Sequence, residues 1–150
     1  MNIKSILAKK GMNVVTIGPA QSIREAIARL AEYNIGALVA VNEAGLPVGI
    51  LSERDITRAL AKDEQIFSKS VSDLMTKDVI TALPQDDLLS VANTMTEKRI
   101  RHLPVVERGK LVGIVSIGDV VKAQRDQYQG EVDTLQTQIL GEKPRYSRVD

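Results

Sequence analysis

Apolar and polar residues follow one order twice along this chain. Each time, a short extended stretch ends at a proline, at residues 14–19 and again at 79–84. Apolar residues then recur every three or four positions, which is the period of a half-buried helix. These positions are Ile23, Ala26, Ile27 and Leu30 in the first case, and Leu88, Val91, Ala92 and Met95 in the second. Ser22 with Glu25 forms a capping-box pair and Asp87 is a second N-cap, so both helix starts are predicted.

Hairpins are predicted after both helices. The runs ALVAV and VGIL flank a Gly-containing turn at 42–47, and the runs LPVV and LVGIV flank another at 107–110. A further helix is predicted to begin just after Ser52 and just after Ser116. Each half therefore has the order β-α-β-β-α, and the sequence predicts an α+β fold.

The two halves align residue by residue. The stretch VVTIGPAQSIREAIARLAEYNIGALVAV at 14–41 corresponds to VITALPQDDLLSVANTMTEKRIRHLPVV at 79–106, and after the turns GILSERDI corresponds to GIVSIGDV. A unit of about 45 residues is too small to bury a core alone. We therefore expect the copies to pack together with pseudo-two-fold symmetry, which creates two equivalent crevices. The expected divisions are 1–70 for the first repeat with its lead-in, 71–125 for the second, and 126–150 for a C-terminal helix and polar tail.

The C-terminal segment departs from the repeat. Val121, Tyr128, Val132, Leu135 and Ile139 follow the spacing of an amphipathic helix. Gly130 weakens this helix by about 1 kcal/mol relative to alanine. The stripe is too short for an independent coiled coil, so we expect it to pack across a homodimer. The final residues, GEKPRYSRVD, are predicted to form a polar tail.

Composition and charge narrow the function classes. Hydrophobic residues make up 43% of the chain, and 20 basic against 19 acidic residues leave a net charge of +1. This balance gives no basic field for nucleic acid or for a membrane surface, and no apolar run reaches the roughly 18 residues of a membrane span. The absence of cysteine excludes disulfides, a thiol nucleophile and cysteine-based metal sites. We expect no metal, no secretory signal and a cytoplasmic location.

The repeated Ser-x-x-Asp pairs, Ser52 with Asp55 and Ser116 with Asp119, carry the candidate chemistry. One interpretation is purely structural, because such a pair caps a helix N-terminus. The other is ligand binding, because the same helix start offers free N–H groups to an anion and its aspartate can accept hydrogen bonds from ribose hydroxyls. The pair occurs in both copies directly after a Gly-led strand, which favours ligand binding.

These motifs, with the T-h-x-P starts (h is apolar) and the run RIRHLPVV, resemble a tandem cystathionine-β-synthase (CBS) domain pair, or Bateman module. The resemblance covers about residues 3–125. It implies an adenosine-containing ligand, namely AMP, ADP, ATP, NAD(H) or S-adenosylmethionine, and no catalytic cofactor. It also implies a homodimer and a regulatory output. The remaining length leaves no room for an effector domain, so we expect the output to reach a separate, unknown effector protein.

The resemblance also implies site residues, because each crevice takes its Ser and Asp from one copy and its base-contacting strand from the other. The first crevice combines Ser52 and Asp55 with Ile80, Thr81, Arg101 and His102. The second combines Ser116 and Asp119 with Val15, Thr16, Gly36 and Ala37. Arg54 and Arg101 favour a phosphate-bearing ligand at the Asp55 crevice, with AMP first. The Asp119 crevice has no counterpart of these arginines, so it is predicted to bind a nucleoside, to bind weakly or to stay empty.

Three other functions compete with nucleotide binding. Catalysis lacks support, because the chain has no cysteine, no P-loop lysine motif and no dinucleotide-type glycine turn. A purely structural interaction module, with both Ser-x-x-Asp pairs serving as caps, would show no response to ligands. A nucleic-acid role conflicts with the neutral charge and the few aromatic residues. Four lysines, Lys9, Lys10, Lys69 and Lys98, are interpreted as solvated charges.

Overall fold

The computed structural model describes residues 1–140, and the predicted polar tail at 141–150 lies outside them. The first repeat has the predicted β-α-β-β-α order, and the second keeps it with its first strand reduced to a single bridge at Ala82, so the fold class is confirmed. The elements of the first repeat are β1 (Thr16–Ile17), α2 (Ile23–Tyr33), β2 (Ala37–Val41), β3 (Pro47–Ser52) and α3 (Glu53–Lys62). Those of the second are α5 (Leu88–Lys98), β4 (His102–Glu107), β5 (Lys110–Ser116) and α6 (Ile117–Leu140). Two further helices, α1 (Ile3–Lys10) and α4 (Val71–Leu74), precede the two repeats.

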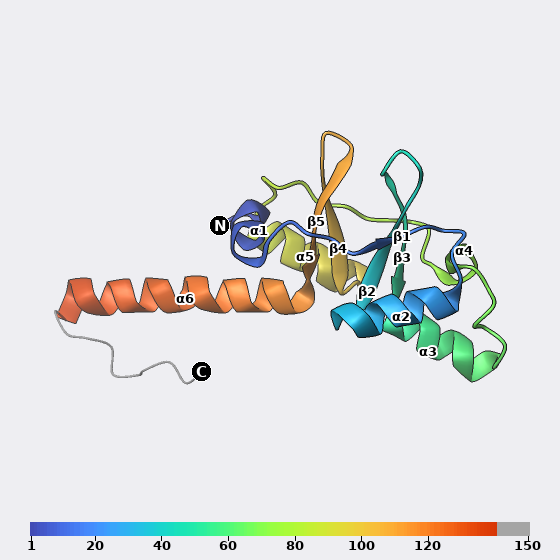
Figure 1. Ribbon diagram of the computed structural model, residues 1–150. Helices are drawn as coiled ribbons and strands as arrows, with labels where there is room; N and C mark the ends of the chain where they lie inside the picture. Colours follow the sequence, from blue (N-terminus) through green and yellow to red (C-terminus); the bar gives the residue numbers. More distant parts are fainter. Residues whose placement is uncertain (141–150) are drawn as a thin grey trace.

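Strand pairing is the same in both repeats. The hairpins β2–β3 and β4–β5 are antiparallel and stand side by side (Figure 1). β1 adds to β2 in parallel, with Ile17 opposite Ala40. In the second repeat this strand is reduced to one parallel bridge, between Ala82 and Val105. These are the residues that the repeat alignment places at Ile17 and Ala40, so the duplication extends to strand register.

The helix ends follow local signals in the sequence. The Ser22 hydroxyl accepts from the Glu25 N–H at 3.2 Å, as the capping pair predicts, and Asp87 caps α5 through the Leu89 N–H. α2 and α5 both end on a left-handed residue, Asn34 with φ 52° and Arg99 with φ 54°. Asparagine is common in this conformation, whereas arginine is not.

The helices that precede the repeats are exchanged between the two hydrophobic cores. Ile3, Ile6 and Leu7 of α1 belong to the core of the second repeat, whereas Val71 of α4 belongs to the core of the first. The backbone contacts match: the Lys4 N–H donates to the Pro84 carbonyl at 2.8 Å, and the Ser72 N–H donates to the Pro19 carbonyl at 2.9 Å. The expected boundary between residues 70 and 71 stays a prediction, because each core is built from chain on both sides of it.

Gly49 and Gly113, the first residue of each repeated phrase, are explained by this exchange. A Cβ at Gly113 would lie 2.6 Å from Leu7 Cδ2, and a Cβ at Gly49 would overlap the Met75 side chain. Each exchanged segment therefore rests a long apolar side chain directly on the backbone of the other repeat's last strand. Any residue larger than glycine would force that side chain to shift.

α6 continues far beyond the repeats and projects away from them (Figure 1). The predicted helix is confirmed over residues 117–140, and it carries exposed apolar side chains: Val121, Tyr128, Leu135 and Ile139. Its start packs against α5, α1 and β5. None of the helices described over residues 1–140 combines the length and the apolar character of a membrane span.

Candidate functional site

Both Ser-x-x-Asp pairs form reciprocal caps at a helix start. The Asp55 N–H donates to Ser52 Oγ at 3.2 Å, and the Ser52 N–H donates to Asp55 Oδ2 at 2.9 Å. The second pair repeats this arrangement, with 3.1 Å from the Asp119 N–H to Ser116 Oγ and 2.9 Å from the Ser116 N–H to Asp119 Oδ2. The capping interpretation is therefore realised in the geometry. It does not exclude ligand binding, because a carboxylate has lone pairs beyond the one used by the cap.

A cavity of about 330 Å³ opens beside the first pair. Its lining comes from both repeats, as expected for the Asp55 crevice. Six predicted residues line it: Ser52, Arg54, Asp55, Ile80, Arg101 and His102. This volume lies at the lower end of the range for small-molecule sites, roughly 300–1,000 Å³. Thr81 was expected here as well but is not part of the lining.

Four arginines line this cavity: Arg54, Arg58, Arg99 and Arg101. Only Arg54 and Arg101 were predicted. Arg58 follows Arg54 by one helical turn on α3, a spacing that places both on one face. Arg99 is the left-handed residue that ends α5. β4 begins three residues later, at His102, and both residues line the cavity. Asp55, Glu53 and Asp78 supply the negative charges of the lining.

His102 lies between the two repeated sites. It lines the cavity, and a Cβ at Gly36 would lie 3.6 Å from its Nε2 atom. Burial, together with the positive charges of Lys10 and Arg101, lowers the pKa of His102, against the opposing influence of Asp119 and Glu53. The imidazole is therefore neutral at pH 7 and offers one donor and one acceptor.

The second expected crevice, around Asp119, stays a prediction, and the structure gives its four expected partners other contacts. Gly36 lines the Asp55 cavity, and its carbonyl accepts from the Glu53 N–H at 3.0 Å. Ala37 is buried in the β2–β3 pairing, opposite Ser52. Val15 packs against the core of the first repeat, and the Thr16 carbonyl accepts from Arg29 at 2.6 Å.

Asp119 also has a partner that no feature of the sequence indicated. The ammonium of Lys10 lies 2.6 Å from Asp119 Oδ2, so the interpretation of Lys10 as a solvated charge was wrong. Lys69 is also paired, with Asp63 at 3.4 Å. A second cavity, of about 80 Å³, includes Asp119 but lies between α1 and α6 rather than between the hairpins.

These features define a class of protein: a tandem α+β module with a polar, arginine-lined crevice between its two repeats. The chain belongs to the CBS domain family, which matches residues 3–62 and 71–126. The mitochondrial CBS domain-containing protein CBSX3 of Arabidopsis thaliana is 35% identical over 125 residues, which is 80% of this chain and 61% of that protein. The CBS domain-containing protein YhcV of Bacillus subtilis is 36% identical over 114 residues, 74% of this chain and 79% of its own length.

Solved structures agree with this assignment. The CBS-domain containing protein ATU1752 of Agrobacterium tumefaciens has a TM-score of 0.79 at 42% identity, covering 83% of this chain and 99% of that one. The CBS domain pair of protein MJ0100, in complex with 5-methylthioadenosine and S-adenosyl-L-methionine, has a TM-score of 0.76 at 33% identity over 85% of this chain and 98% of its own. Protein PAE2072 of Pyrobaculum aerophilum, complexed with AMP, has a TM-score of 0.77 at 27% identity over 88% and 99%.

Proposed function

We propose that this chain is a non-catalytic regulatory module that binds an adenine nucleotide, AMP first, in the Asp55 crevice and acts on a separate effector protein. The observation that carries the proposal is the cavity shared by the two repeats. It combines a helix-start carboxylate with four arginines. The relatives crystallised with AMP and with S-adenosylmethionine support an adenosine ligand. No catalytic cofactor is proposed.

The lining of the cavity matches the parts of such a ligand. Asp55, held by its cap, is the acceptor for the ribose hydroxyls. Arg54 and Arg58 on α3, with Arg99 and Arg101 from the second repeat, supply charge-assisted donors to phosphate oxygens. Ile80 gives an apolar surface for the base, and the neutral ring of His102 gives a polar contact. The arginines favour a phosphate-bearing ligand over the sulfonium ligand, so we rank AMP, ADP, ATP and NAD(H) above S-adenosylmethionine.

The proposed mechanism is a shift in population. The ligand contacts both repeats, so it stabilises the arrangement that closes them around it. A partner that prefers this arrangement then binds more tightly, and by linkage the partner tightens nucleotide binding by the same factor. The cytoplasmic location stays a prediction, since one relative is named as mitochondrial.

The test is thermal unfolding with AMP, ADP, ATP, NAD(H) and S-adenosylmethionine, each on protein stripped of co-purified ligand. At about 100 times its dissociation constant, a ligand stabilises the folded state by about 2.7 kcal/mol. For this chain length the midpoint then rises by roughly 5–10 °C. If no compound moves the midpoint, the alternative stands: an interaction module whose capping boxes, complete without a ligand, are only structural.

Arg99 allows binding and stability to be separated. Arg99→Gly is expected to weaken AMP roughly tenfold, because one charge-assisted contact is lost. Stability without ligand should rise by about 1 kcal/mol, because glycine adopts the left-handed conformation without strain. Asn34→Gly is the matched control: it changes the equivalent cap of α2, outside the cavity lining. Calorimetric titration and urea unfolding measure the two effects, and equal AMP affinity in both variants would rule out a ligand role for Arg99.

We also propose that a second copy of this chain covers the apolar stripe of α6. Tyr128 is 68% exposed and Ile139 is 73% exposed, and a free helix end of this length is marginal in water. Tyr128, Val132, Leu135 and Ile139 are spaced by four, three and four residues. Continued toward the N-terminus, this alternation places Arg125 in the same stripe. A parallel pair would place each Arg125 against its own copy, so we favour an antiparallel pair.

Sedimentation tests the homodimer. Leu135→Asp is expected to convert the dimer to a monomer, because a carboxylate in the apolar seam would be desolvated. Thr137→Asp adds the same charge on the other side of the helix and should leave the dimer intact. A wild-type chain that sediments as a monomer at micromolar concentration would overturn this proposal.

A further inference from the structure

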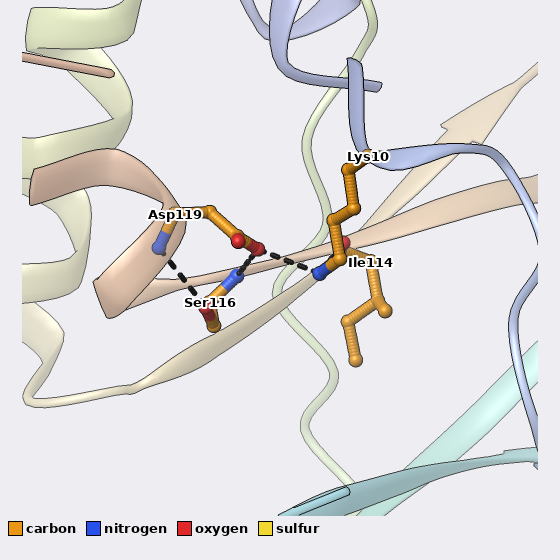
Figure 2. Close-up of polar contacts among 4 residues, drawn as sticks. All are labelled: Lys10, Ile114, Ser116 and Asp119. Atoms are coloured by element: carbon orange, nitrogen blue, oxygen red, sulfur yellow. Dashed lines mark hydrogen bonds and ion pairs between the residues drawn. The ribbon is translucent and has the colours of Figure 1, made fainter. Parts of the chain in front are cut away.

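The two crevices differ in what lies on their aspartates. Figure 2 shows Lys10, at the end of α1, reaching the start of α6. Its ammonium donates to Asp119 Oδ2 at 2.6 Å and to the Ile114 carbonyl at 2.9 Å. Asp119 Oδ2 is also the atom that accepts from the Ser116 N–H, so cap and ammonium meet on one oxygen.

The first repeat shows what Lys10 replaces. Ile50 corresponds to Ile114 in the repeat alignment, and its carbonyl accepts from the Thr76 backbone N–H at 2.8 Å. In the first repeat, the neutral backbone N–H of Thr76 therefore takes the place that the Lys10 ammonium takes in the second repeat. The same backbone acceptor is satisfied in both cases, but only in the second repeat does the donor bring a positive charge to the aspartate.

Lys10 can reach Asp119 because the segment before the first repeat is longer than the corresponding segment before the second repeat. Leu7 and Met75 occupy matching places on Gly113 and Gly49. Six residues separate Leu7 from Val14, whereas three separate Met75 from the corresponding Val79. The additional residues extend α1 to eight residues, against four in α4, and the extra turn carries Lys10 to Asp119.

The charged groups around Asp119 also differ from those around Asp55. Burial, the largest influence, raises the pKa of Asp119, but the hydrogen bonds from Lys10 and Ser116 outweigh it and hold the pKa below its usual value. Neither the Lys10–Asp119 pair nor the Lys69–Asp63 pair involves Asp55. The charged residue that the segment between α4 and α5 brings to the Asp55 cavity is Asp78, which repels a carboxylate instead of binding it.

We propose that Lys10 determines how many nucleotides this chain binds, by occupying the Asp119 carboxylate in place of a ribose and so leaving the Asp55 crevice as the only nucleotide site. This inference rests on the proposed function and deepens it. A ribose binds such a carboxylate by donating from its two hydroxyls. Lys10 takes an acceptor oxygen with a short charge-assisted bond, which a neutral diol must displace.

The experiment is calorimetric titration with AMP of four proteins: the wild type, Lys10→Met, Lys10→Arg and Lys4→Met. Methionine keeps an unbranched side chain without the ammonium, arginine keeps the charge, and Lys4→Met removes an equal charge from the exposed face of α1. We expect one AMP per chain for the wild type, Lys10→Arg and Lys4→Met. We expect two for Lys10→Met, and one again for Lys10→Met with Asp119→Ala, which shows that the new site uses Asp119.

The failures are distinguishable. A wild type that already binds two AMP molecules, or a Lys10→Met protein that binds one, would overturn the role of Lys10 while the proposed function stands. Two sites in Lys4→Met would attribute the effect to net charge and would also overturn it. If neither the wild type nor Lys10→Met binds AMP or any other compound of the panel, the proposed function fails, and this inference fails with it.

Discussion

Asp55→Ala is expected to remove at least half of the rise in unfolding midpoint that AMP gives the wild-type protein. The Asp55 carboxylate lies in the arginine-lined cavity and, in the proposed function, accepts the ribose hydroxyls. Without it, the ligand loses its charge-assisted contacts, and the buried hydroxyls lose their acceptor. Such losses are typically about 1.5–3 kcal/mol, and they are comparable to the whole stabilisation expected from AMP at 100 times its dissociation constant.

The substitution also removes a helix cap, so it needs a control that loses the same cap. Asp119→Ala supplies it, because the two capping boxes have nearly the same geometry. Both variants should lose about 0.5–2 kcal/mol of stability without ligand. Asp119→Ala also loses the Lys10 ion pair but should retain the full response to AMP. An equal AMP response in both variants and in the wild type would leave only the capping role for Ser-x-x-Asp.

Ile3→Ala is expected to destabilise the second repeat, although Ile3 precedes the first. Its side chain is fully buried in the core of the second repeat, with Leu88 and Val91 of α5. Removing three carbons from such a site costs about 2–5 kcal/mol, depending on how far the cavity collapses. Native-state hydrogen exchange locates the effect: the amides of β4 and β5 should lose protection before those of β2 and β3.

The counterpart is Val71→Ala, in the linker helix α4. Val71 is fully buried in the core of the first repeat, so the order of lost protection should reverse. Lys4→Ala, on the exposed side of α1, should change stability by less than about 0.5 kcal/mol. Loss of protection in β2 and β3 from Ile3→Ala would contradict the exchanged arrangement of the lead-in helices.

Local patterns sufficed for most of the fold. The stripe from Ile23 to Leu30, the cap at Ser22 and the repeated hairpins each depend on residues a few positions apart, so periodicity and capping chemistry predicted them. The exchange of α1 and α4 could not be predicted in this way. An apolar face shows that a helix is buried, but Ile3 would satisfy either core, and only the packing decides which one.

The candidate site shows the same limit. Ser52 with Asp55 is a local pair, and the family resemblance placed Arg101 and His102 beside it. Arg99 and Lys10 were missed because their roles depend on where two helix ends lie in space. Lys10 reaches Asp119 only because the segment before the first repeat has three extra residues. The residue type alone does not distinguish such a lysine from an ordinary exposed one.

The exchanged lead-in helices also bear on the origin of the chain. A polypeptide with one repeat and its own lead-in could not complete its core, since each lead-in here packs on the repeat that it does not adjoin. Two such polypeptides would complete each other, but only above the concentration at which they meet. Joining two copies in one chain removes this dependence on protein concentration, because the covalent connection holds the second repeat at an effective concentration in the millimolar range. Fusion of the two copies would therefore have kept the folded state populated even when the protein is scarce.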